Sequence, residues 1–180
     1  MRHTDTLTKA SIMANSTFAF ALVITAVLAS AQAFGSNVLS KTWAKVLVLC
    51  GLVGAVYLGT SRDFYLPFLG PNMVPSSLLK VSTPPDATVA IAVDAPQGAT
   101  HVMYWAARTS LTTSGDPQTA YGDFTNAGVV PVAGGRATLR LACPGTYQAM
   151  RRTLPRHLHY RYVFTNGLVS SVKTLPVTCP

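Results

Sequence analysis

Two long stretches without charge occupy the first third of the chain. No Asp, Glu, Lys or Arg occurs between residues 10 and 40, and none occurs between residues 46 and 61. A helix needs about 20 apolar residues to cross the hydrocarbon core of a bilayer. The first stretch supplies them at 11–34, and the second, at 44–61, is slightly shorter. The pattern predicts an N-terminal tail and two transmembrane helices within residues 1–61, paired as a hairpin with both ends on one side of the membrane.

The flanks of the second helix can extend its reach. Trp43 suits the membrane interface, and the stems of Lys41 and Lys45 can carry their charges out to water. The few basic residues around the two helices do not decide which side is cytoplasmic. Small residues would allow the helices to approach each other closely. These are Ala26, Ala29, Ser30 and Ala33 in the first helix and Gly51, Gly54 and Gly59 in the second.

Two other interpretations of these helices stay open. The first apolar stretch follows the basic residues Arg2 and Lys9 and contains Ala-x-Ala at 31–33, as a cleavable signal peptide would. The second is short enough to be the buried core helix of a soluble protein. We expect two membrane helices.

After residue 80 the spacing of apolar residues changes to two. Val89, Ile91 and Val93 alternate with small or polar residues, and similar alternation occurs at 137–143 and 158–164. Such a period predicts strands with one buried and one wet face. Asn166-Gly167 between 160–164 and 168–172 is a strong hairpin signal. We expect six or seven strands in residues 81–180, forming an all-β sandwich of immunoglobulin or fibronectin III type.

The segment at 62–80 joins the helices to this domain. Arg62 ends the charge-free stretch, and Phe64, Tyr65 and Phe68 form an aromatic belt suited to the membrane interface. The prolines in this segment forbid a continuous helix and stiffen the connection. We expect a rigid mount between anchor and domain.

The same segment resembles a known protein family. Arg-Asp-Phe-Tyr-Leu-Pro-Phe-Leu-Gly-Pro at 62–71, followed by Val-Pro-Ser-Ser-Leu-Leu at 74–79, is similar to a segment of small virion membrane proteins. These are minor capsid proteins of large nucleocytoplasmic DNA viruses, including chloroviruses and mimivirus relatives. The resemblance implies a structural role, holding an outer protein shell to the membrane beneath it, and implies no catalytic residues.

Composition gives little support to an enzyme. Hydrophobic residues make up 49% of the chain and charged residues 11%, and Glu is absent. No nucleophile elbow, phosphate loop, zinc-protease helix or dinucleotide fingerprint occurs. His157 and His159 could share a metal ion with His101 or a cysteine, but no spacing matches a known zinc pattern. We therefore expect no enzymatic activity, cofactor, metal or small-molecule substrate.

The excess of positive charge is the main clue to partners. The chain carries a net charge of +8, and residues 80–180 carry nine basic residues against four aspartates. Anionic lipid headgroups or acidic protein patches would suit such a surface. A solubilising surface is the plain alternative, and no motif indicates nucleic acid binding. The expected contact residues are Arg151, Arg152, Arg156, His157, His159 and Arg161.

The chain contains three cysteines, which are candidates for packing or for a disulfide. Cys50 lies within the second apolar stretch and can serve as a small packing residue. Cys143 and Cys179 could form a disulfide that ties the C-terminus to the sheet, or remain as two thiols in a reducing compartment. The sequence leaves both states open.

Together these features predict a structural minor capsid protein. It would lie in the internal membrane of a large icosahedral virus, and in host internal membranes during assembly. The expected partners are the lipid bilayer, the major capsid protein and other minor capsid proteins. The alternatives are a membrane-anchored adhesion or receptor-like module with an immunoglobulin-like ectodomain, and a secreted β-protein with a cleaved signal.

Overall fold

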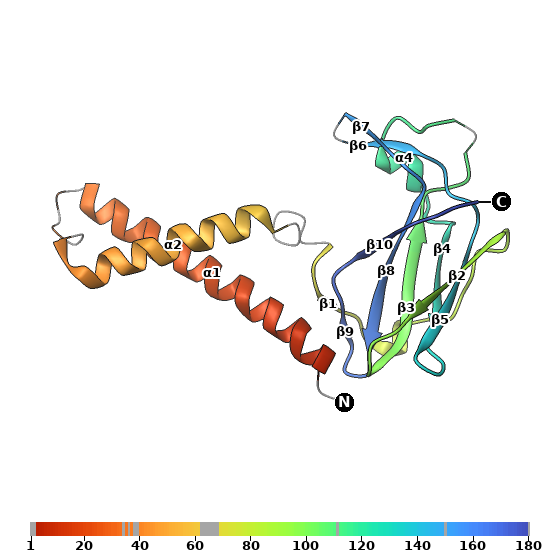
Figure 1. Cartoon of the computed structure of the whole chain (residues 1–180), viewed down its shortest axis with the longest axis horizontal. Coiled ribbons are helices and arrows are strands. Elements are labelled where there is room, and N and C mark those ends of the chain that lie inside the picture. Colours follow the sequence, from red (N-terminus) through yellow and green to blue (C-terminus); the bar gives the residue numbers. More distant parts are fainter. Residues whose placement is uncertain are drawn as a thin grey trace. The chain divides into compact units, whose positions relative to one another are not determined.

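The chain forms a helical unit and a β-unit, shown in Figure 1. The computed structural model describes residues 3–33, 35, 37, 40–61, 69–110, 112–149 and 151–179. The helical unit covers Thr6–Pro71, and the β-unit contains Asn72–Pro180.

The helical unit consists of two apolar helices. Helix α1 covers His3–Ala33 and α2 covers Thr42–Thr60. Within them, Met13–Gln32 and Thr42–Thr60 are long and apolar enough to cross a bilayer, by length and composition. Two N-terminal apolar helices of membrane-span length are thus confirmed. Helix α1 begins earlier than predicted because its first residues, although polar, continue the same helix.

The β-unit contains short helices and strands in antiparallel sheets. Its helices are η3 (Ser76–Leu78) and α4 (Pro117–Tyr121). Its strands are β1 (Asn72–Met73), β2 (Val89–Asp94), β3 (Ala99–Ala106), β4 (Ala127–Pro131), β5 (Arg136–Leu141), β6 (Tyr147–Ala149), β7 (Arg152–Leu154), β8 (His157–Phe164), β9 (Leu168–Val169) and β10 (Lys173–Pro176).

The largest sheet has β8 at its centre. Its order is β1-β9-β8-β3-β4, and β10 also pairs with β8. Since β3 occupies one edge of β8, β9 and β10 lie along the other. Strands β2 and β5 form a second sheet, and β6 and β7 form a third. All these pairings are antiparallel. A mostly antiparallel β-region after the helices is therefore confirmed.

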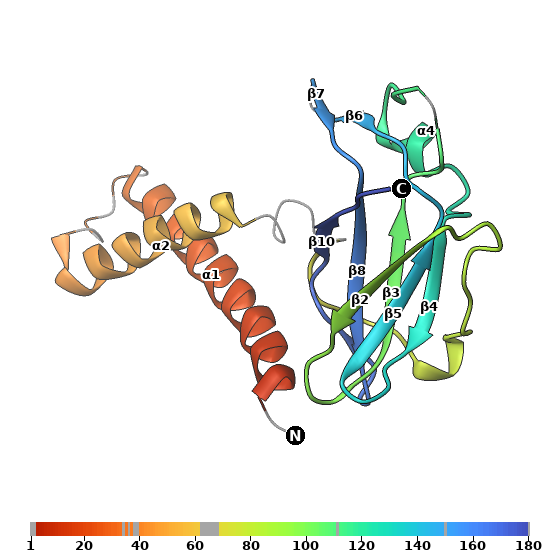
Figure 2. The same cartoon turned by 45° about the vertical axis from the view of Figure 1, so that its right-hand side comes forward.

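The first two sheets share one apolar core. Figure 2 shows β2 and β5 crossing in front of β3 and β8. The core includes Val102 from β3, Leu139 from β5 and Leu158 from β8, each fully buried. Tyrosine hydroxyls also join the layers: Tyr104 donates to the Arg140 carbonyl at 2.5 Å, and Tyr162 donates to the Asp94 carbonyl at 2.7 Å.

The predicted hairpin at Asn166-Gly167 joins β8 to β9. Gly167 has a φ of +79°, which side chains rarely adopt, and its N–H donates to the Phe164 carbonyl at 2.9 Å. The strand predicted at 168–172 is shorter than expected. Strand β9 ends at Val169, and the new strand β10 begins at Lys173.

The β-unit begins before residue 81, where the sequence placed its boundary. Strand β1 pairs with β9, and Ser82 bridges to Val129 of β4. Asn72, Met73 and Val74 of the predicted mounting segment therefore belong to this β-unit, because their backbone groups bond to β9 and the turn before it.

Candidate membrane anchor and partner-binding surfaces

Helices α1 and α2 contact each other through two glycines of α2. A Cβ on Gly51 would overlap the Thr25 side chain of α1, and one on Gly54 would fall 3.1 Å from the Phe18 ring. The Phe18 ring also packs on Tyr57, with the ring centroids 4.5 Å apart. The absence of side chains at Gly51 and Gly54 therefore permits this contact.

The predicted set of small contact residues is only partly correct. Gly51 and Gly54 are buried, as expected, but a Cβ on Gly59 would meet nothing within 4 Å. Ala26, Ala29 and Ser30 of α1 are exposed. The prediction is wrong for them because α1 presents the face with Phe18 and Thr25 to α2.

The outward faces of both helices are apolar and uncovered. Phe20 is 68% exposed and Val27 62% on α1, while Val56 is 67% exposed on α2. An open groove of about 410 Å³ on α2 is lined by Leu52, Val53, Val56 and Tyr57. Such a continuous apolar surface suits a hydrocarbon environment better than water.

The predicted interface residues of α2 lie at its first turn. Lys41 precedes the helix, and Trp43 and Lys45 are exposed within it. This places two cations and an indole at one end of the apolar surface, as membrane-interface anchors require. The other predicted interface residues, Arg62, Phe64, Tyr65 and Phe68, lie outside the described residues.

At one end of the β-unit, β6, β7 and α4 gather, as Figure 1 shows. Arg151, Arg152 and Arg156 are all exposed there, and we call them the arginine hairpin. Phe124, beyond α4, is 56% exposed at the same end and stacks on Tyr121 at 5.9 Å between ring centroids. Positive charge beside an exposed aromatic ring can bind an anionic protein or lipid surface.

Helix α4 is fixed by its first residue. The Asp116 carboxylate accepts hydrogen bonds from the Thr119 N–H at 2.8 Å and the Thr119 hydroxyl at 2.7 Å. These bonds, the backbone one first, hold the pKa of Asp116 below its usual value. Asp116 is thus the N-cap of α4, and its carboxylate is occupied by these bonds.

Two of the six predicted contact residues are buried instead of exposed. His157 and Arg161 are each 8% exposed, because β8 is the central strand and both of its faces are covered. The guanidinium of Arg161 lies over the Trp105 ring, 5.9 Å from its centroid. His159 is partly buried, and its Nδ1 lies 2.9 Å from the Thr174 hydroxyl. Of the six predicted contact residues, only the three of the arginine hairpin are exposed.

His157 ends a chain of buried hydrogen bonds. Its Nδ1 lies 2.6 Å from the Pro155 carbonyl, which can only accept, so Nδ1 carries the proton. Nε2 then accepts from the Tyr147 hydroxyl at 3.0 Å, and Tyr147 accepts from the Tyr121 hydroxyl at 2.9 Å. Burial, and then the bond donated to Tyr147, raise the pKa of Tyr121. The chain fixes α4 and β6 to the end of β8.

Sequence reasoning also missed a buried asparagine. Asn126 Nδ2 donates to the carbonyls of Ala107 at 2.8 Å and Ala142 at 3.0 Å, and Asn126 Oδ1 accepts from the Ala142 N–H at 2.9 Å. One side chain thereby joins the ends of β3 and β5. An Asn just before a strand is the only signal in the sequence, and it indicates a turn equally well.

Cys143 and Cys179 form a disulfide, with 5.8 Å between their Cα atoms. The bond joins the end of β5 to the segment after β10, while Cys50 of α2 is a free thiol. Within the described ranges, no three His, Cys, Asp or Glu side chains gather closely enough to hold a metal ion.

The sequence was also compared with known proteins. No protein-family model matches the chain, and no curated protein matches it significantly.

Proposed function

We propose that the protein is a membrane-anchored structural protein, in which α1 and α2 cross a bilayer as a hairpin and the β-unit binds other proteins. The observation that carries this proposal is the uncovered apolar face of the helical pair. Transfer of one large apolar side chain out of water stabilises by about 1.5–3 kcal/mol. Phe20, Val23, Val27, Leu52 and Val56, all more than half exposed, would together gain on the order of 10 kcal/mol in a bilayer.

Membrane extraction tests the anchor. The full chain, expressed in cells, should stay in the membrane pellet after alkaline carbonate washing and dissolve only in detergent. Replacing Val23 and Val53 by Lys should release it, because a charge near the centre of a span costs about 2.5–3.5 kcal/mol. Gln148→Lys, on the exposed side of β6, is the matched control and should change nothing. Release of the unaltered chain by carbonate would contradict a transmembrane anchor.

We further propose that the β-unit is an immunoglobulin or fibronectin III-like sandwich. Two features support this: β2 pairs with β5 in one sheet, and β4, β3, β8 and β10 follow one another in the facing sheet. Such domains commonly serve as binding modules on a rigid scaffold. An experimental structure of the full chain in micelles that separates β2 from β5 would refute this assignment.

The specific role we propose is that of a minor capsid protein in the internal membrane of a large icosahedral DNA virus. The resemblance of residues 62–79 to virion membrane proteins supports it, and the arginine hairpin offers a surface for capsid proteins. Stepwise detergent treatment of purified particles, followed by mass spectrometry, tests this role. The protein should leave with the membrane under strong detergent and remain with shell proteins under mild detergent. Its absence from both fractions would refute the role.

One observation favours a second candidate, a membrane-anchored binding module on a cell surface. The disulfide between Cys143 and Cys179 is typical of oxidising compartments such as the secretory lumen and the cell surface, and is rare in the cytosol. Thr112→Asn tests this candidate, since it creates an Asn-Thr-Ser glycosylation site at an exposed position of the β-unit. Glycosylation in cells would place the β-unit in the secretory lumen and favour the cell-surface module. An unmodified chain in the same membranes would favour the capsid role.

A further inference from the structure

One edge of strand β5 is paired with β2, and the other edge is largely unpaired. In an antiparallel pair, successive residues point their backbone N–H and C=O groups alternately toward and away from the partner. The bond from Ala95 N–H to the Gly135 carbonyl, at 2.8 Å, fixes this alternation. Together with the register of β2 and β5, this bond shows that the backbone N–H and C=O groups of Ala137, Leu139 and Leu141 point toward β2. The groups of Arg136, Thr138 and Arg140 therefore face the other edge.

At both ends of this second edge, the backbone groups of β5 have hydrogen-bond partners within the β-unit. Arg136 exchanges two backbone bonds with Ala133, at 2.9 and 3.0 Å. The Arg140 carbonyl accepts from the Tyr104 hydroxyl, and Ala142 is held by Asn126. Between these points, in the part of the chain that the structure describes, the N–H and C=O of Thr138 and the N–H of Arg140 have no protein partner. Three hydrogen-bonding groups thus face outward along an exposed stretch of strand.

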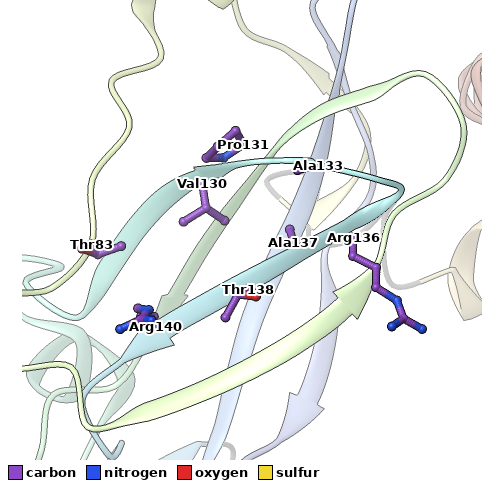
Figure 3. Close-up of a pocket in the computed structure, with 8 residues that line it drawn as sticks. All are labelled: Thr83, Val130, Pro131, Ala133, Arg136, Ala137, Thr138 and Arg140. Atoms are coloured by element: carbon purple, nitrogen blue, oxygen red, sulfur yellow. The ribbon is translucent and has the colours of Figure 1, made fainter.

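These groups border a groove between β5 and β4, drawn in Figure 3. The groove has a volume of about 360 Å³. Val130 and Pro131 of β4 line it on one side and Ala137 and Thr138 of β5 on the other, and Arg140 and Arg136 lie at opposite ends of β5. Pro131 lacks an N–H, so β4 cannot close the groove by pairing regularly with β5. The remaining lining residues are Thr83 and Ala133.

The charge at the groove limits what can occupy it. Two arginines line it and no acidic residue does, although Asp94 pairs with Arg136 at 2.8 Å from the neighbouring strand. If a second copy of β5 paired antiparallel about Thr138, Arg136 of each copy would lie opposite Arg140 of the other. Like charges directly opposite destabilise a strand pair. The arginines therefore disfavour self-association and favour an acidic strand.

We propose that the open edge of β5 binds an extended, acidic segment of a partner protein by strand addition. The segment would form three backbone hydrogen bonds, with Thr138 and Arg140, and place a carboxylate beside the Arg140 guanidinium. The proposal rests on the proposed function, since it locates the contact between the β-unit and a shell protein. Unlike a contact at the arginine hairpin, binding at β5 requires backbone hydrogen bonds between the strand and the partner segment.

Peptide binding to the full chain in detergent micelles tests this site. The probe is a fluorescent peptide of about ten residues that alternates Val, which favours strands, with Asp, which supplies the carboxylates. Two comparison peptides are used. One alternates Val and Lys, and the other has the Val and Asp sequence with N-methyl groups on the backbone edge that would pair with β5. Arg140→Glu removes the guanidinium without touching the bond from Tyr104 to the carbonyl. Lys173→Glu makes the same charge change at an exposed position of β10, outside the groove lining and the arginine hairpin, and is the matched control.

The acidic peptide should bind at least about tenfold more tightly than the basic and N-methylated peptides, since about 1.4 kcal/mol corresponds to tenfold. Arg140→Glu should weaken its binding by a similar factor, and Lys173→Glu by less than about twofold. Thr138→Pro, which removes an unpaired edge N–H, should also weaken it. Equal binding of the N-methylated peptide, or equal losses in the two Glu variants, would overturn the proposal. Either result would leave the membrane anchor and particle fractionation unaffected, so the two proposals can fail separately.

Discussion

Asn126 is 3% exposed and uses its whole amide to join two strand ends. Its Nδ2 and Oδ1 atoms make three hydrogen bonds to backbone groups of Ala107 and Ala142. Truncation would leave these groups buried without partners, which costs more than the bonds themselves contribute. We expect Asn126→Ala to lower the free energy of unfolding by about 2–4 kcal/mol. Urea unfolding in micelles of full-length chains that carry Trp43→Phe, so that Trp105 is the sole tryptophan, measures the loss by fluorescence.

The exposed Gln148 of β6 provides the comparison for this prediction. Gln148→Ala should change the free energy of unfolding by less than about 0.5 kcal/mol, as is usual at exposed positions. If Asn126→Ala were equally mild, the ends of β3 and β5 would be held mainly by apolar packing, and the role assigned to Asn126 would be wrong.

His157 shows why polar residues on one face of a strand are a weak guide to exposure. In the sequence, His157, His159 and Arg161 alternate with apolar residues, which predicts a wet face. In the structure, the Pro155 carbonyl and Tyr147 hydroxyl satisfy both ring nitrogens of His157, so its burial costs little. The Tyr147 hydroxyl comes from β6, and no local pattern around β8 indicates that it lies beside His157.

At the scale of elements, the pairing of α1 and α2 depends on Gly51. Any side chain there would overlap Thr25, whereas Gly59 in the same helix faces open space. We expect Gly51→Val to separate the helices at a cost of about 1–3 kcal/mol, as in other overpacked contacts. Gly59→Val should leave them paired.

Cysteine cross-linking measures this pairing. Phe18→Cys and Tyr57→Cys, in a chain with Cys50→Ala, replace two rings that pack together. A short bis-maleimide should link them quickly, and Gly51→Val should slow the reaction by about tenfold or more, since about 1.4 kcal/mol is tenfold. Equal rates in the Gly51 and Gly59 variants would show that the contact does not require Gly51.

The elements differ in how well the sequence predicts them. Strands β2 and β5 follow the expected alternation because each has one face in the core and one in water. Strand β4, which reads Ala-Gly-Val-Val-Pro, was not predicted, since Gly and Pro are poor strand residues. Gly128 is needed there because a Cβ would fall 2.5 Å from the Tyr104 hydroxyl. That requirement arises from tertiary packing, which local propensity does not include.

At the scale of the whole molecule, buried tyrosines make the β-unit sensitive to alkali. Burial raises the pKa of Tyr104, Tyr121, Tyr147 and Tyr162 above the usual value of about 10. The unfolded chain therefore loses these protons at lower pH than the folded chain does. The stability that they contribute is complete below pH about 10 and is lost as pH rises through the folded pKa values.

We therefore expect the free energy of unfolding to fall steeply above pH about 10. Tyrosinate absorbance from Tyr104, Tyr121, Tyr147 and Tyr162 should rise only as the β-unit unfolds, because these four hydroxyls keep their protons in the folded state. Recording absorbance together with Trp105 fluorescence tests the link. A single early rise that leaves the fluorescence unchanged would show that these hydroxyls are accessible in the folded state.

The disulfide is a covalent tie between Cys143 and Cys179, which are 36 residues apart in sequence. Closing a loop of that length restricts the unfolded chain and stabilises the fold by roughly 3–4 kcal/mol. The loop encloses β6 to β10, so the bond ties the C-terminal half of the main sheet to the end of β5. Replacing both cysteines by Ser should lower the free energy of unfolding by that amount, and reductant should lower it equally in the unaltered chain. Cys50→Ser, which removes the thiol of α2, should leave both measurements unchanged. If reductant had no effect on the unaltered chain while the double variant was destabilised, the loss would come from packing of the sulfur atoms and not from the covalent tie.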